Sequence, residues 1–315
     1  MTDLAYHDGT LRPLDQITVG IRTHALHYGT GVFEGIRAYW NAEAEQLYAF
    51  RLADHYARLC ASAKVYGMQA SLSVEELCDV TIDLLARNEV REDVYIRPLV
   101  FKSSETMGLW SRGLTDSLVI YHVPLGAYIS ESGIRCCVSS WRRPDGNFVP
   151  ARAKISGIYA GMALARREAL EAGFDEALTL TTHGKVSEGS GENIFLVIDG
   201  KLVTPPPGDD LLAGITRASL IELADAELGL RTVERSVNRS ELLVADEVFL
   251  CGTAAEVTPV VEIDRRPVGD GEIGPVATAM RELYMRVVRG THDDYLDWCR
   301  PIHQGAHPAV TAADR

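Results

Sequence analysis

The sequence has few cysteines and no long apolar run. Six cysteines occur in 315 residues and, apart from the adjacent Cys136 and Cys137, they lie far from one another. This spacing contains no C-x-x-C metal motif and no dense disulfide framework, so we interpret the cysteines as buried thiols. No run of about 18 apolar residues occurs, which excludes a membrane-spanning helix of ordinary length.

Basic residues are also scarce relative to acidic ones. The formal net charge is -13, and no cluster of basic residues occurs along the chain. We therefore expect no nucleic-acid partner and no membrane partner, and the expected ligand is a small molecule. Residues 1–20 carry acids and lack the apolar run of about 7–15 residues that is typical of a secretory signal, so the sequence predicts a cytoplasmic protein.

The composition is that of a folded globular protein. Hydrophobic residues make up 46% and charged residues 24% of the chain, and the length predicts roughly two domains. Pro124-Leu125-Gly126, near the midpoint, is the best boundary. We expect a small N-terminal α/β domain (1–123), an interdomain loop (124–130), a large domain (131–290) and an irregular C-terminal tail (291–315).

Apolar periodicity and turn residues predict helices interleaved with short strands. The expected helices are 51–66, 74–88, 155–172, 215–228 and 275–289, and the expected strands are 94–101, 117–123, 135–140, 176–181, 193–198 and 247–251. Asp199-Gly200 is a strong hairpin signal. Because hairpins join several strands of the second half, the pattern favours an α+β fold with a mixed sheet or barrel over a doubly wound sheet.

Lysine is rare, which draws attention to each one. The chain has Lys64, Lys102, Lys154, Lys185 and Lys201, and every other basic residue except histidine is arginine. Lys154 lies among small and apolar residues in PARAKISG, at the start of a predicted helix. Desolvation there would disfavour the charged amine, which suits Schiff-base chemistry. A solvated lysine beside a helix start is the simpler interpretation of this residue taken alone.

Three glycine-containing segments could surround a flat, phosphorylated ligand. SEGSGEN (187–193) places a carboxylate in a loop where backbone can approach a ligand closely. Residues 214–217 put a glycine and a threonine at a helix start, and the turn at 252–256 exposes further backbone N–H groups, both of which favour an anion. Each segment alone is more simply an ordinary turn. An amine, an acid and two anion-binding turns together match a pyridoxal-phosphate site.

The sequence also resembles a known enzyme family. Six segments carry the resemblance, in order along about residues 3–290: HALHYGTGVFEGIR (24–37), YIRPL (95–99), AKISGIY (153–159), SEGSGEN (187–193), GITR (214–217) and CGTAAEVTPV (251–260). They are similar to those of branched-chain amino acid aminotransferases in the fold type IV pyridoxal-phosphate family. The resemblance implies a two-domain fold type IV enzyme, with a mixed sheet or pseudo-barrel in its large domain.

The resemblance implies a role for each cofactor residue. Lys154 looks like the lysine that bonds covalently to the cofactor and then moves a proton between the substrate's α-carbon and the cofactor. Glu188 looks like the acid that pairs with the pyridine nitrogen, and Tyr159 like the tyrosine that bonds the ring oxygen. The residues implied at the phosphate are Arg51, Ile215, Thr216 and Thr253. No metal is implied.

For the substrate, the resemblance implies an aromatic pocket with one cation. Its residues are Tyr28, Phe33, Tyr95, Arg97, Tyr128, Thr253 and Ala254. Aromatic walls would bury a branched side chain, Arg97 would meet the second carboxylate of glutamate, and backbone N–H groups of the last two residues would bind the α-carboxylate. The alternative without a binding role is that Arg97 is a structural ion-pair residue within a strand. By family analogy Tyr28 reaches the neighbouring subunit's site, which implies a homodimer or larger homo-oligomer.

The expected activity is transfer of an amino group between L-leucine, L-isoleucine or L-valine and 2-oxoglutarate. Leu125, where close relatives usually have a bulky aromatic, and Thr106, where glycine is common, put substrate preference in doubt. The rivals within the fold are a D-amino acid or R-amine transaminase and an aminodeoxychorismate lyase. A non-catalytic cofactor-binding protein is the rival from another class.

Overall fold

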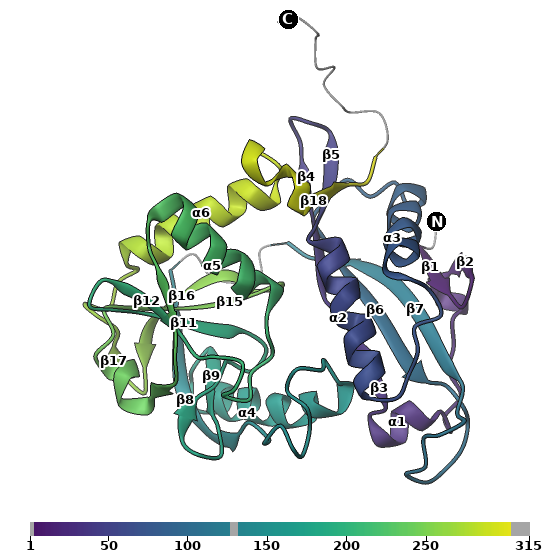
Figure 1. Cartoon of the computed structure of the whole chain (residues 1–315), viewed down its shortest axis with the longest axis horizontal. Helices are drawn as coiled ribbons and strands as arrows, with labels where there is room; N and C mark the ends of the chain where they lie inside the picture. Colours follow the sequence, from purple (N-terminus) through teal and green to yellow (C-terminus); the bar gives the residue numbers. More distant parts are fainter. Residues whose placement is uncertain (1–2, 127–131, 304–315) are drawn as a thin grey trace, which may run out of the picture.

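The computed structural model describes residues 3–126 and 132–303, whose strands form two sheets that lie side by side (Figure 1). The first sheet has the order β18-β5-β4-β6-β7-β1-β2, with β3 also paired to β6. Its strands are β1 (Leu4–His7), β2 (Thr10–Pro13), β3 (Gly31–Phe33), β4 (Ile36–Asn41), β5 (Gln46–Phe50), β6 (Val94–Lys102), β7 (Asp116–Pro124) and β18 (Cys299–Pro301). All of their pairings are antiparallel.

The second sheet has the order β13-β12-β11-β15-β16-β8-β9-β10-β14, with β17 paired to β16. Its strands are β8 (Ile134–Arg142), β9 (Glu176–Leu180), β10 (Lys185–Val186), β11 (Asn193–Ile198), β12 (Lys201–Thr204), β13 (Thr232–Glu234), β14 (Val237–Asn238), β15 (Glu247–Gly252), β16 (Glu256–Ile263) and β17 (Arg266–Pro267). β8 pairs in parallel with both β9 and β16, and β12 with β13, while the other pairings are antiparallel. The predicted mixed sheet is confirmed.

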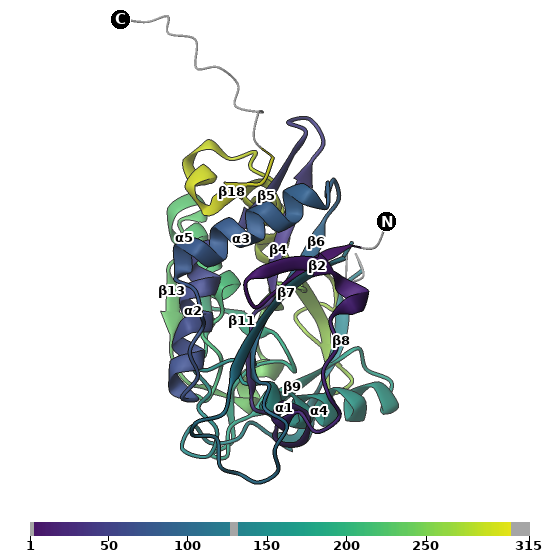
Figure 2. The ribbon, with the colours of Figure 1, turned by 90° about the vertical axis from the view of Figure 1, so that its right-hand side faces the viewer.

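Six α-helices are described: α1 (His24–Tyr28), α2 (Leu52–Val65), α3 (Val74–Arg87), α4 (Tyr159–Glu171), α5 (Ile215–Leu228) and α6 (Pro275–Val288). The α2 and α3 helices pack their apolar faces on the first sheet, and α4 packs on β8 and β9. A core shared by both sheets brings Phe50 of β5 against Tyr284 of α6, close to β15 and β11. Figure 2 shows the same arrangement from the side.

Local signals in the sequence account for several element ends. Ser73 caps α3 in a reciprocal capping box with Glu76, which satisfies N–H groups at the helix start. Gly229 ends α5 in the left-handed conformation that glycine adopts without strain. Asp199 and Gly200 both have positive φ, as a two-residue hairpin between β11 and β12 requires. The predicted hairpin is confirmed.

Two element predictions need correction. Residues 155–172 do not form one helix, because Ile155 bridges to Val32 and residues 156–158 form a 3-10 turn before α4 begins. The tail after residue 290 is not wholly irregular, because η4 (Asp293–Trp298) leads into β18, which pairs with β5. The division at residues 124–130 stays a prediction, and residues 127–131 lie outside the described part of the chain.

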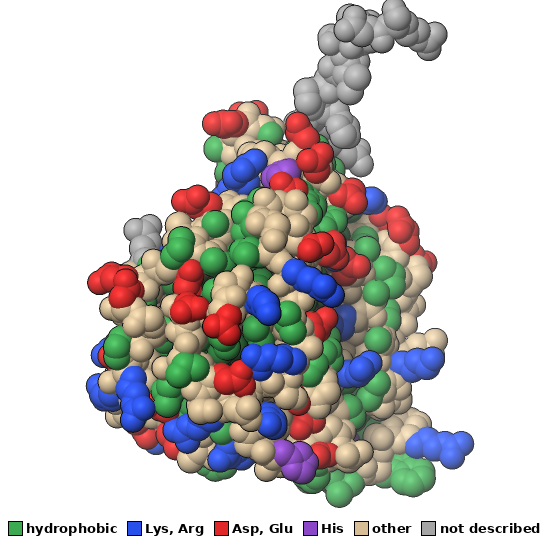
Figure 3. All heavy atoms as spheres, turned by 60° about the vertical axis from the view of Figure 1, so that its left-hand side comes forward, with side chains coloured by type: hydrophobic (Ala, Val, Ile, Leu, Met, Phe, Trp, Pro, Cys, Tyr) green, Lys and Arg blue, Asp and Glu red, His purple; other side chains and the backbone are tan. Residues whose placement is uncertain are grey.

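Two surface properties bear on partners. Among the described residues no helix combines the length and the apolar character needed to cross a membrane. On the face drawn in Figure 3, acidic and basic side chains are interspersed.

Candidate active site

Lys154 is held between the first sheet and α2 by backbone contacts. Its carbonyl oxygen accepts a hydrogen bond from the Phe33 N–H at 3.1 Å, and its own N–H donates to the Ser62 hydroxyl at 3.1 Å. The next residue, Ile155, bridges to Val32 of β3. These contacts fix the backbone of Lys154 and so restrict where its amine can reach.

The amine of Lys154 lies beside a phenol. Nζ donates to the Tyr159 oxygen at 2.7 Å and lies 5.1 Å from the Phe33 ring centre. Burial alone would lower the pKa of Lys154, but Tyr159, followed by Glu34 and Tyr95, outweighs burial and raises the pKa above its ordinary value. Burial thus disfavours the charged amine, as the sequence predicts, but the neighbouring groups reverse the net shift in the protein without ligands.

A cavity of about 50 Å³ beside Lys154 combines cations, backbone turns and an acid. The start of α5 faces this cavity at residues 214–216, and the first N–H groups of a helix have no intrahelical acceptor. Arg58 of α2 lines it as well. Helix N–H groups and a guanidinium together form a suitable site for a phosphate.

Glu188 is one of two glutamates that line this small cavity, and hydrogen bonds and an ion pair hold its carboxylate in place. Oε1 lies 2.8 Å from Nη2 of Arg143, while Oε2 accepts hydrogen bonds from the Asn193 amide and the Leu212 N–H, each at 3.1 Å. Burial raises the pKa of Glu188, although Arg143 acts in the opposite direction. Each carboxylate oxygen can accept more than one hydrogen bond, so Glu188 can also accept one from a protonated ring nitrogen.

A larger cavity of about 490 Å³ opens on the other side of the lysine. The two cavities share Lys154, Tyr159, Gly191, Glu192 and Thr253. Phe33, Tyr95 and Tyr121 provide aromatic surface, which favours an apolar side chain. Lys154 therefore lies at the boundary between the small cavity, which has cations and helix N–H groups, and the larger, more aromatic one.

Arg97 is the arginine of the larger cavity, which it lines together with Lys154. Its guanidinium lies over the Phe33 ring at 4.5 Å, and Nη2 donates to the Tyr95 phenol at 3.1 Å. Within the described part of the chain it forms no ion pair with a carboxylate. Its Nε is buried without a hydrogen-bond partner. This geometry argues against the structural ion-pair interpretation and leaves Arg97 able to bind an acidic group of a ligand.

The turn at residues 252–256 closes the larger cavity with Thr253 and Ala254. Buried Arg37 supports this turn from behind: its Nη1 lies 2.9 Å from Oε1 of Glu256 and 3.4 Å from the Ala254 carbonyl oxygen. Glu256 itself has a φ of 53°, an unusual backbone conformation for this residue type. The turn is therefore held in one conformation by contacts from the first sheet.

Comparison with known proteins agrees with this geometry. Residues 31–263 match the family described as amino-transferase class IV. The chain belongs to the class IV aminotransferases. A protein from Aquifex aeolicus named as a probable branched-chain-amino-acid aminotransferase is 47% identical over 302 residues, which cover 96% of this chain and 97% of that protein.

Solved structures of class IV aminotransferases superpose closely on the chain. The branched-chain aminotransferase of Thermoproteus uzoniensis with norvaline is 43% identical, with a TM-score of 0.92, over 96% of this chain and all of that chain. The branched-chain amino acid aminotransferase of Thermobaculum terrenum in its PLP-form is 38% identical, with a TM-score of 0.92, over 96% of this chain and 99% of that chain. The predicted fold type IV architecture is confirmed.

Most of the site residues that the sequence predicts are found in the lining of the small and the larger cavity. Those at the small cavity are Lys154, Tyr159, Glu188, Ile215, Thr216 and Thr253, and those at the larger cavity are Phe33, Tyr95, Arg97, Lys154, Thr253 and Ala254. Sequence reasoning did not include Arg58, Arg143, Tyr121 or Glu192. One sequence signal could have pointed to Arg58: it follows His55 by three residues, so the two side chains lie on the same side of the predicted helix.

Two described residues of the prediction do not line these cavities. Arg51 is oriented elsewhere: its Nε lies 2.8 Å from Oδ2 of Asp54, and its guanidinium stacks 4.2 Å above the Trp298 ring. Arg51 therefore does not line the small cavity, whereas Arg58 does. Tyr28 lines a separate cavity, where its phenol accepts a hydrogen bond from the Gly108 N–H at 2.7 Å. Tyr128 lies outside the described residues.

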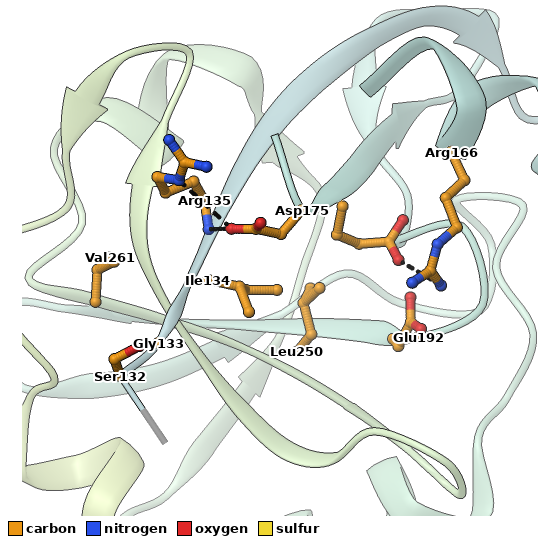
Figure 4. Close-up of a pocket in the computed structure, with 10 residues that line it drawn as sticks. Ser132, Gly133, Ile134, Arg135, Arg166, Asp175, Glu192, Leu250 and Val261 are labelled. Carbon is orange, nitrogen blue, oxygen red and sulfur yellow. Dashed lines mark hydrogen bonds and ion pairs between the residues drawn. The ribbon is translucent and has the colours of Figure 1, made fainter. Parts of the chain in front are cut away.

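Figure 4 shows the lining of a further cavity of about 460 Å³, which shares Glu192 with the other two cavities. The Arg166 guanidinium there lies 3.1 Å from a carboxylate oxygen of Glu176. Burial, followed by the nearby Glu176 charge, raises the pKa of Glu192 to about 8. The raised pKa favours the protonated form of Glu192 at neutral pH.

Proposed function

We propose that this chain is a pyridoxal-phosphate-dependent aminotransferase that moves the amino group between L-leucine, L-isoleucine or L-valine and 2-oxoglutarate. The observation that carries the proposal is the position of Lys154, whose amine lies 2.7 Å from the Tyr159 phenol, at the boundary between the small cavity and the larger, more aromatic cavity that contains Arg97. The family membership of the chain supports the same activity.

The donor set of the small cavity fits pyridoxal phosphate. Arg58 and the start of α5 would hold the phosphate, and Glu188 would hold the ring nitrogen protonated. Tyr159 would bond the ring oxygen. Pyridoxal phosphate supplies an aldehyde that bonds covalently to amines and a protonated ring that stabilises negative charge on the substrate's α-carbon.

The chain's own residues then perform binding and proton transfer. Nζ of Lys154 would take the proton from the α-carbon of the amino acid and deliver it to the cofactor, and Tyr159 keeps that amine oriented through its 2.7 Å contact. The backbone N–H groups of Thr253 and Ala254 bind the α-carboxylate. If different residues of the cavity hold the α-carboxylate and the side chain, the single hydrogen of the α-carbon can be directed at the amine.

The larger cavity accounts for two unlike side chains. Phe33, Tyr95 and Tyr121 bury a branched aliphatic group, at about 25 cal/mol per Å² of apolar surface removed from water. Arg97 meets the second carboxylate of glutamate or 2-oxoglutarate, since no acid of the described chain occupies it. A D-amino acid or R-amine transaminase is the second candidate, and the presence of both Arg97 and the Thr253-Ala254 turn in one cavity favours the L-amino acid reaction.

We propose that the enzyme acts as a homodimer or larger homo-oligomer. A cavity of about 360 Å³ lined by Leu14, Ile17, Val19, Leu26 and other largely apolar residues lies on the N-terminal part, and Ile21 beside it is largely exposed. Exposed apolar surface of this kind is typical of a protein interface. Light scattering after size exclusion should give at least twice the 34.5 kDa chain mass.

The cytoplasm is the compartment that we propose. All six cysteines are unpaired thiols, which suits a reducing environment.

Borohydride trapping tests the proposed cofactor chemistry. Reduction of the cofactor-loaded protein followed by peptide mapping should place the label on Lys154, and Lys154→Ala should lose the label and essentially all turnover. Lys185→Ala is the matched control, since that lysine binds Asn238 away from the cavities. A label on Lys64, Lys102, Lys185 or Lys201 would overturn the assignment.

A further inference from the structure

Glu34 is a fully buried carboxylate that has no role in the reaction described above. It lies between β3 and β4, directly after Phe33 of the substrate cavity. Oε1 accepts a hydrogen bond from Nε of Arg58 at 2.6 Å, and Oε2 accepts one from Nη2 of the same side chain at 2.9 Å. Nδ1 of His55 lies 2.8 Å from Oε2. Both oxygens are therefore engaged, and two of the three side-chain contacts go to one guanidinium.

The contact between Glu34 and Arg58 is bidentate, which fixes the plane of the guanidinium as well as its position. A single hydrogen bond would leave the group free to rotate, whereas two parallel ones do not. A third contact completes the restraint, because Nη1 of Arg58 donates to the Ala213 carbonyl oxygen at 2.8 Å, directly before the start of α5. Glu34 and Ala213 thus hold the guanidinium from two sides.

Counting donors shows what remains for a ligand. A guanidinium has five N–H groups, of which Glu34 occupies two and Ala213 one. Two N–H groups remain, and Arg58 lines the small cavity together with Gly214, Ile215 and Thr216. The remaining donors and the first N–H groups of α5 therefore lie around the same small volume, where a phosphate would sit.

We propose that Glu34 is a positioning residue for the cofactor phosphate: by holding Arg58 in a bidentate ion pair, it directs the two remaining guanidinium N–H groups at the anion. Glu34 itself does not touch the cofactor and acts only through Arg58. The proposal rests on the proposed use of pyridoxal phosphate. It predicts a defect that depends on the phosphate group, whereas a merely structural ion pair would affect every ligand of the cavity alike.

Binding to the cofactor-free protein tests this, with pyridoxal phosphate and pyridoxal as paired probes that differ only in the phosphate. In Glu34→Gln the dissociation constant for pyridoxal phosphate should rise about 10- to 100-fold, while that for pyridoxal changes less than about 3-fold. Inorganic phosphate should also compete less well against pyridoxal phosphate in the variant. Arg58→Met should lose the same preference for pyridoxal phosphate over pyridoxal. The double variant Glu34→Gln/Arg58→Met should bind pyridoxal phosphate no more weakly than Arg58→Met alone.

The control is Asp116→Asn. In the same sheet, Oδ1 of Asp116 lies 2.7 Å from Nζ of buried Lys102, and neither residue lines the two cavities. This variant should leave the preference for the phosphorylated probe unchanged. The proposal would be overturned if folded Glu34→Gln bound both probes as tightly as wild type, or if its affinity for both fell by the same factor. If Glu34→Gln and Glu34→Asp both fail to fold by circular dichroism, the carboxylate is required for folding and the positioning role is also rejected. A wild-type protein that binds neither probe would instead contradict the proposed function.

Discussion

Arg37 and Glu256 form a buried ion pair, with 2.9 Å between Nη1 and Oε1, that connects β4 of the first sheet to the first residue of β16 in the second. Nη2 of Arg37 also donates to the carbonyl oxygens of Leu125 and Gly126, each at 2.9 Å. One side chain thus contacts the turn proposed to bind the α-carboxylate and the segment that leaves the first sheet. We expect the stability of the whole protein to depend on this pair.

Replacing Arg37 should destabilise the fold strongly. Arg37→Met leaves Glu256 largely buried without its partner, which costs about 3–5 kcal/mol of unfolding free energy. Arg37→Met/Glu256→Met should be more stable than Arg37→Met, because the unpaired charge is removed. Urea unfolding of the three proteins measures this, and equal stability of the single and double variants would show that the ion pair is unimportant.

Gly35 should be required for the position of Tyr95. A Cβ atom at residue 35 would lie 1.9 Å from the Tyr95 phenol oxygen, which is also the acceptor for Arg97. Gly35→Ala should therefore displace Tyr95 and lower kcat/KM for all substrates by at least about 10-fold. Gly161→Ala is the control, since a Cβ there meets no atom within 4 Å in α4. Matching kinetics of the two variants would contradict the expected displacement.

Arg97→Leu should separate the two substrate classes. A hydrogen bond to a charged group contributes about 1.5–3 kcal/mol, so kcat/KM for glutamate or 2-oxoglutarate should fall by about 10- to 150-fold. Leucine should change much less, because it has no second carboxylate. Half-reaction rates with leucine and glutamate decide this. Equal losses for both would mean that Arg97 supports the strand or the α-carboxylate.

Several elements could be predicted because their signals are local. Ser73 and Glu76, Asp199 and Gly200, and Gly229 act through neighbours a few residues away, so the sequence itself contains both partners. The same holds for Lys154 and Tyr159, which lie five residues apart. The start of α4 could not be predicted in this way, because the bridge from Ile155 to Val32 depends on a strand more than a hundred residues earlier.

The different positions of the two arginines have a similar cause. Arg51 directly precedes α2 and Arg58 lies within it, seven residues later. The sequence alone does not show which of the two faces α5. The choice depends on Glu34 and Ala213, which hold Arg58, and on Trp298, which stacks on Arg51. The strand β18 was missed for the same reason, since its partner β5 is distant in the sequence.

The stability of the protein should depend on pH through Glu192. Because its pKa in the folded protein is raised to about 8, the folded state holds a proton there that the unfolded chain releases above about pH 5. The stabilising contribution is therefore present at low pH and is lost as pH rises from about 5 to 8. Glu192→Gln cannot titrate, so its stability relative to wild type should increase over this range. Urea unfolding at about pH 5, 7 and 9 checks this, and a constant difference between the proteins would contradict it.

The most direct test of the proposed function is a single-turnover spectral screen of the cofactor-loaded protein with L-leucine, L-glutamate, D-alanine and R-1-phenylethylamine. A branched-chain L-amino acid aminotransferase should lose its cofactor absorbance band rapidly with L-leucine and L-glutamate, and much more slowly or not at all with the other two amines. A fast reaction with D-alanine or R-1-phenylethylamine and a slow one with L-leucine would contradict the proposed activity, and a band unaffected by all four would contradict an aminotransferase altogether.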